Sequence, residues 1–201
     1  MTARDRHGLT GAAVRWCAAS VGWAALAGVT AFLAGLATSS LALVGFGANS
    51  MLDGTASGVL VWRFRHERGG GEVEAVERRA GLAVGGVMTV VALYLAVRSV
   101  IALAEHAGPE ASSVGVVVTA ASALVLPVLA RAKLRLAARL ESPGLRGDGV
   151  LSLAGAVLAA ATLLSVLVSA ALGWWWADST AALLVSAVLL IEGIRTCAPA
   201  K

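Results

Sequence analysis

The sequence has 201 residues, of which 58% are hydrophobic and 14% charged, and its mean hydropathy is +0.83. This composition is too apolar for a soluble domain and predicts an all-α protein that crosses a membrane several times. The net charge of +4 comes largely from arginines in short connecting segments, where membrane topology already explains them, so we expect no nucleic acid partner.

Six apolar segments are each long enough to form a transmembrane helix. In chain order they span residues 16–36, 41–62, 81–104, 114–130, 149–172 and 177–194. Two charged segments, 63–80 and 131–148, are expected to be loops between spans. The chain stops soon after the sixth segment, so we expect one transmembrane domain over residues 1–201 and no soluble C-terminal domain. No soluble domain follows the first segment, as one would after a secretory signal peptide.

The basic residues predict the orientation of these helices. Arg or Lys occurs in the N-terminal segment, in the two charged connections and after the last span, whereas the three opposite connections contain neither. Because cytoplasmic loops carry the excess of basic residues, both termini are expected in the cytoplasm. The sequence thus indicates a multi-pass protein of the plasma membrane, with six spans.

Segment 41–62 carries the strongest candidate for a functional residue. At about 1.5 Å per residue, Asp53 lies roughly 13 Å from the Trp62 end, near the middle of the membrane. A carboxylate there costs at least about 2.5 kcal/mol and needs a proton, a cation or a polar partner. Asn49 lies four residues earlier, on the same helical face. The pair predicts a cation or proton site with oxygen ligands; the alternative is a structural hydrogen bond inside the bundle.

Three segments carry a resemblance to a known family. SSLALVGFGANSMLDG is similar to the second helix of the cation diffusion facilitator family, whose members export divalent metals in exchange for protons. SPGLRGDGVLSLAGAVL resembles the start of the family's fifth helix, and GWWWADSTAALLVSAVLLIEG resembles the sixth. The resemblance implies six spans and a homodimer, and it places Asn49 and Asp53 at a pair of metal-ligand positions.

The fifth helix departs from the family pattern. Asp148 matches the Asp that opens this helix, but the two ligand positions that follow are occupied by Leu151 and Gly155. Asp148 is therefore either a ligand or a helix cap that adds charge at the entrance. Ser152 could supply a further oxygen, or could bond only to its own backbone. The candidate metal residues are thus Asn49, Asp53, Asp148 and Ser152.

Other polar residues are expected to have structural roles. Asp178 is expected to cap the sixth helix. Glu192 and Arg195 are three residues apart and should pair. The two cysteines, Cys17 and Cys197, follow no metal or redox spacing and are expected to be free thiols.

These features predict a divalent cation transporter that exchanges the metal for protons, with no prosthetic group. Oxygen ligands favour harder cations. The sequence leaves manganese, zinc, iron and cobalt open. The alternative is a membrane scaffold or partner subunit that keeps the fold without a working metal site. Leu151 and Gly155, which cannot bind a metal, favour this alternative. No nucleophile with a base, metallohydrolase spacing or phosphate loop is present, so an enzyme is not expected.

Overall fold

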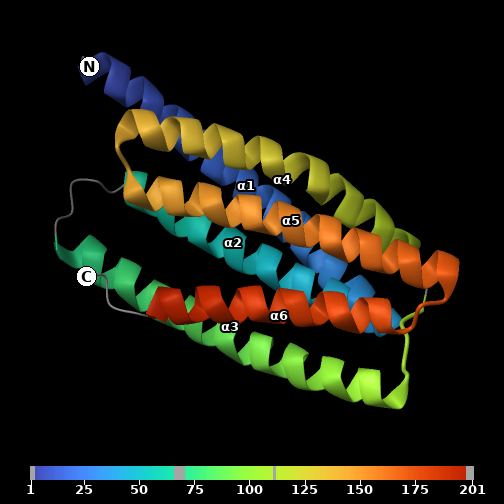
Figure 1. Ribbon diagram of the computed structural model, residues 1–201. Helices are drawn as coiled ribbons and strands as arrows, with labels where there is room; N and C mark the ends of the chain where they lie inside the picture. The colour runs from blue at the N-terminus through green and yellow to red at the C-terminus, as the bar shows by residue number, and fades with distance from the viewer. Residues whose placement is uncertain (1–2, 66–70, 111, 198–201) are drawn as a thin grey trace.

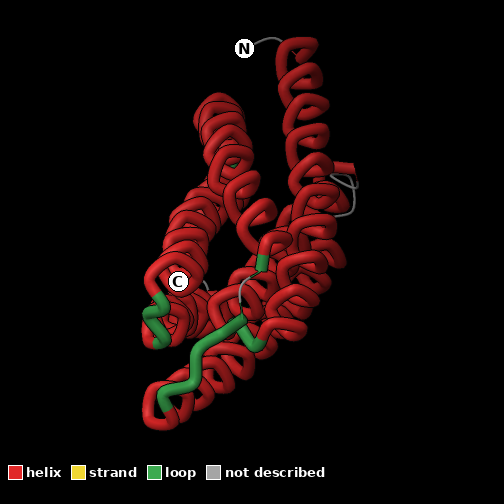
Figure 2. The backbone as a smooth tube through the Cα atoms, turned by 90° about the vertical axis from the view of Figure 1, so that its right-hand side faces the viewer, coloured by secondary structure: helices red, strands yellow, loops and turns green. Residues whose placement is uncertain are grey.

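The computed structural model describes residues 3–65, 71–110 and 112–197, and these residues are almost entirely helical (Figure 2). The helices are α1 (Ala3–Thr38), α2 (Leu41–Arg65), α3 (Gly71–Glu105), α4 (Ser113–Leu140), α5 (Pro143–Leu172) and α6 (Trp176–Cys197). They run side by side, with the start of α1 and the end of α6 at the same end of the bundle (Figure 1). The all-α fold class is confirmed for this part of the chain, in which no strand occurs.

Helix α2 lies at the centre of the bundle. It contacts α1, α3, α5 and α6, and 14 of its residues are buried. Each of the other helices exposes large apolar side chains on its outer face, for example Leu26, Val90, Leu124, Leu164 and Leu184. Among the residues whose burial is described, α2 contributes no large apolar side chain to that outer surface. The surrounding helices therefore cover most of α2, although Thr55 remains exposed.

Five of the helices are long and apolar enough to cross a membrane, within the described residues. These stretches are Gly8–Thr38, Gly85–Glu105, Ser113–Leu140, Gly144–Leu172 and Trp176–Arg195. Helix α2 is not among them, and its apolar run is interrupted by Asn49 and Asp53. The chain is thus a membrane protein with several apolar helices around a more polar central one.

The α1 and α2 backbones approach closely because glycine lies between them. A Cβ atom added to Gly47 would lie 2.6 Å from the backbone nitrogen of Phe32, and one added to Gly35 would lie 2.6 Å from that of Val44. Real side chains do not tolerate such distances, so these two positions require glycine. Small residues that let helix backbones approach are a common means of helix association in membranes.

The charged segment 131–148, expected to be a loop, is almost wholly helical. Helix α4 continues to Leu140 and α5 begins at Pro143, which leaves only Glu141 and Ser142 between them. Ser142 caps α5, since its hydroxyl accepts a hydrogen bond from the Leu145 N–H at 3.4 Å. The loop prediction fails because Arg, Lys and Leu favour helix and Pro suits a helix start. In the other charged segment α2 continues to Arg65, α3 starts at Gly71, and residues 66–70 lie outside the described ranges.

Asp178 has a different role from the predicted one. It lies in the first turn of α6, but its carboxylate accepts hydrogen bonds from the Ser40 hydroxyl at 2.5 Å and from the Leu41 and Ala42 N–H groups at 2.8 and 3.3 Å. These donors belong to the start of α2, where a negative charge is favoured by the helix dipole. Asp178 therefore caps α2 and not its own helix.

We predict that Asp178→Ala lowers the free energy of unfolding by about 2–4 kcal/mol, more than the roughly 1 kcal/mol typical of a lost cap, because the donors it leaves lie in a buried region. Thermal unfolding in detergent micelles measures this loss. Thr55→Ala, at an exposed position on α2, is the control and should change stability by less than about 0.5 kcal/mol. Equal stability of the two variants would refute the inter-helix cap.

Candidate functional site

A lysine side chain lies fully buried inside the bundle. Lys133 is on α4, on the same inner stripe as the buried Leu126, Ala130 and Ala137, and its side chain has no exposed surface. The stripe has the three- and four-residue spacing of a core-facing helix side. Sequence reasoning missed this residue because it lies among exposed arginines, Arg131 and Arg135 included. The apolar stripe that it interrupts was the available signal.

The Lys133 ammonium group is held by oxygens from two other helices. Its Nζ lies 2.7 Å from Asp148 Oδ2 on α5, and it donates hydrogen bonds to Ser57 Oγ on α2 and Ser152 Oγ on α5, each at 2.9 Å. A lysine ammonium has three protons, so these contacts satisfy all its donors. Helices α2, α4 and α5 are thus joined through one buried cation.

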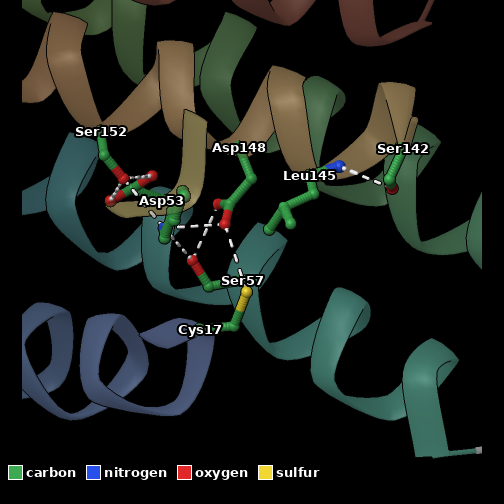
Figure 3. A network of polar contacts seen from close by, with 8 residues as sticks. Cys17, Asp53, Ser57, Ser142, Leu145, Asp148 and Ser152 are labelled. Carbon is green, nitrogen blue, oxygen red and sulfur yellow. Dashed lines mark hydrogen bonds and ion pairs between the residues drawn. The ribbon is translucent and has the colours of Figure 1, made fainter. Parts of the chain in front are cut away.

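The same two hydroxyl groups also donate hydrogen bonds to two carboxylates. Ser57 donates to Asp148 Oδ1 at 2.8 Å, and Ser152 lies 3.3 Å from both carboxylate oxygens of Asp53. Figure 3 shows Asp148 and Ser152 pointing from α5 toward Asp53 and Ser57 on α2. Lys133 is therefore linked directly to Asp148 and, through Ser152, to Asp53.

A thiol from α1 completes the group. Cys17 Sγ donates a weak hydrogen bond to Asp148 Oδ2 at 3.7 Å, and the thiol is free, as predicted. The side chain of Cys197 lies outside the described part. We call the whole set the Lys133 cluster; it comprises Cys17, Asp53, Ser57, Lys133, Asp148 and Ser152. It draws side chains from α1, α2, α4 and α5, so its formation requires most of the bundle.

The structure brings three of the four predicted site residues together. Asp53, Asp148 and Ser152 belong to the Lys133 cluster, and both carboxylates are only 4% exposed. The expectation that Asp148 caps helix five is wrong, because α5 begins five residues earlier at Pro143 and Ser142 is its cap. Asp148 lies within the length of α5, where its side chain can contact side chains of other helices.

Asn49 lies one turn from Asp53 on α2 and close to Gly155 on α5, one of the two family ligand positions at which this chain has no ligand side chain. It is 7% exposed, and a Cβ atom added to Gly155 would lie 3.6 Å from its amide nitrogen. An acidic side chain at position 155 would therefore approach Asn49. Because residue 155 is glycine, this position of α5 has no side-chain oxygen that could bind a metal together with Asn49.

The Lys133 cluster contains more acidic than basic side chains. Two carboxylates, Asp53 and Asp148, face one ammonium group, so one formal negative charge remains when both acids are ionised. Cys17, Asp53 and Asp148 belong to one cluster, but no three His, Cys, Asp or Glu side chains of the described residues are arranged so that they could hold a metal ion by themselves. A cation held here would therefore also use neutral oxygens, such as Ser152 Oγ.

Comparison with known proteins identifies the type of domain. Residues 18–200 match the family model described as the cation efflux transmembrane domain. A search among curated proteins finds no match to the chain. The matched residues include every member of the Lys133 cluster except Cys17, which lies directly before them.

We predict that Asp148→Ala lowers the free energy of unfolding by about 3–5 kcal/mol, because it leaves the Lys133 ammonium buried without a carboxylate. The double variant Lys133→Met/Asp148→Leu should recover much of this loss, since neither charge then remains. Unfolding in detergent measures each variant. Arg195→Gln is the control. It breaks the exposed ion pair that Arg195 forms with Glu192 at 3.0 Å, a pair that the sequence predicts. This substitution should lower the free energy of unfolding by less than about 1 kcal/mol. If the double variant loses as much unfolding free energy as the two single substitutions together, Lys133 and Asp148 are not a coupled pair.

Proposed function

The chain belongs to the cation efflux family, and on this premise we propose that it carries a divalent metal cation across the membrane in exchange for protons. Family membership makes it a cation transporter of the cation diffusion facilitator type. One observation carries the finer proposal: two buried carboxylates, Asp53 and Asp148, lie in one hydrogen-bonded cluster inside a bundle of apolar helices. Buried acids of this kind in membrane helices are typical of ion pathways.

The proposed cation site is centred on Asp53, with Asn49, Ser152 and Asp148 as further oxygen donors. Asp53 lies 12 residues from each end of α2, at Leu41 and Arg65, which supports a site near the middle of the membrane. A carboxylate binds either a proton or a metal cation, so the two compete for it, as exchange requires. Oxygen ligands favour harder cations such as manganese or ferrous iron, while zinc and cobalt remain candidates.

We propose six spans with both termini in the cytoplasm of a plasma-membrane protein. Arginines in the last turns of α2, α4 and α6 lie at the end of the bundle where α1 starts, which supports this orientation. At the opposite end, Trp174 and Trp176 are exposed and stacked at 5.1 Å, as suits an interfacial anchor. Homodimer formation is proposed from the family resemblance alone.

A non-transporting scaffold or partner subunit is the second candidate. Two observations favour it: Lys133 already supplies a positive charge to the carboxylates, and Leu151 and Gly155 provide no ligands on α5. Such a protein would keep the bundle and bind no cation. Transport by the purified protein distinguishes the two candidates.

We predict that the protein reconstituted in proteoliposomes takes up at least one ion from a panel of divalent cations, and faster with an opposing proton gradient. Asp53→Ala should reduce uptake to background, because the central carboxylate is lost, and Asn49→Ala should weaken uptake or change the preferred metal. Ser186→Ala is the matched control: it removes a buried hydroxyl that bonds Ala92 O at 2.8 Å outside the cluster and should transport normally. Equal losses in Asp53→Ala and Ser186→Ala would indicate a structural role, and no uptake by the wild type would favour the scaffold.

The orientation is tested by labelling single cysteines on intact cells with a membrane-impermeant maleimide. A cysteine at Pro109, between α3 and α4, should react, whereas one at Glu141, between α4 and α5, should react only after the cells are opened. Cys197 is replaced by serine in both variants, and the buried Cys17 is kept. Reaction at Glu141 from outside would reverse the proposed topology.

A further inference from the structure

The space between the two carboxylates is already occupied by a positive charge. The Lys133 ammonium group contacts Asp148, Ser57 and Ser152 at 2.7–2.9 Å, and its side chain is fully buried. The titratable groups of the cluster are Asp53 on α2, Asp148 on α5 and the Cys17 thiol on α1. Lys133 is the one basic side chain of the cluster.

The oxygens that hold Lys133 are the ones that the proposed transport site needs. Asp148 Oδ2 and Ser152 Oγ both accept from Lys133, and Ser152 also bonds Asp53. A divalent ion binds carboxylate oxygens at roughly 2.0–2.6 Å. It would therefore lie within a few ångströms of the ammonium group, where two like charges repel strongly at the low effective dielectric of a buried site. The metal and the ammonium group cannot share these oxygens.

We propose that Lys133 is a tethered cation that occupies the transport site in the absence of metal, and that a divalent cation binds by displacing its ammonium group. This inference rests on the proposed function above. The exchange replaces one cation by another and forms no covalent bond. Only an ion that binds two carboxylates better than an ammonium group can enter, which selects small divalent cations over monovalent ones.

The position of Lys133 leaves a route for its withdrawal. It lies seven residues before Leu140, the end of α4, or about 10 Å along the helix. A lysine has four flexible methylene groups and can extend its charge toward the nearer water–membrane interface. The displaced ammonium group can thus move toward the end of the bundle where the α4–α5 turn lies.

Removal of the charge tests the competition directly. Lys133→Gln keeps a polar side chain that can bond Ser57 and Ser152 but carries no charge, and Lys133→Arg keeps the charge. We expect Lys133→Gln in nanodiscs to bind Mn²⁺ at least about tenfold more tightly than the wild type by calorimetry, a gain of about 1.4 kcal/mol. Lys133→Arg should bind no more tightly than the wild type. Equal or weaker binding by Lys133→Gln would overturn the proposal and assign Lys133 a positioning role.

A second measurement uses the wild-type protein and does not depend on the folding of a variant. Lys133 and Lys201 are the only lysines in the sequence, so reductive methylation followed by mass spectrometry reports on each separately. Mn²⁺ should increase the methylation of Lys133 and leave that of Lys201 unchanged. No increase at saturating Mn²⁺ would overturn the displacement.

Uptake of Mn²⁺ into proteoliposomes, measured in parallel, separates this inference from the proposed function. Transport by the wild type with no affinity gain in Lys133→Gln would leave the function standing and remove only the tethered cation. No binding or transport by the wild type, but Mn²⁺ binding by Lys133→Gln, would mean that Lys133 blocks the site permanently, and would overturn both the displacement and the transport function. An absence of binding in both proteins would overturn both.

Discussion

The buried ion pair between Lys133 and Asp148 accounts for the arrangement of the polar residues in the bundle. A buried pair offsets the cost of desolvation only if hydrogen bonds satisfy the remaining protons and lone pairs. Ser57 and Ser152 do this, since each accepts from the ammonium group and donates to a carboxylate. The polar face of α2 therefore has a matching polar face on the α4–α5 hairpin, and neither would be tolerated alone in an apolar bundle.

The sequence predicts the helical fold class and singles out Asp53, but it does not predict the side chains that Asp53 contacts. Apolar length locates the helices, and Asp53 is conspicuous because it interrupts an apolar run. The arginines around Lys133 favour a loop in the sequence, whereas helix propensity carries α4 on to Leu140. Asp178 bonds a backbone N–H group 137 residues away in the sequence, a contact that no local pattern encodes. The missed features are those that depend on packing between distant helices.

The departures from the family pattern on α5 and the lysine on α4 change the site in the same direction. Gly155 supplies no carboxylate beside Asn49, and Lys133 adds a positive charge beside Asp148. Both changes make the interior of the bundle less negative than it would be with a carboxylate at position 155 and no lysine at position 133.

Helix α2 is synthesised before the residues that satisfy its polar groups. Its interior acid and serine depend on α4 and α5, and its first N–H groups depend on a carboxylate of α6. Until the ribosome has added these later helices, the polar groups of α2 lack these partners, which raises the free-energy cost of placing α2 in lipid. We therefore expect α2 to integrate stably only once the later helices have been made, and a chain truncated before α6 to leave polar groups of α2 without partners inside the membrane.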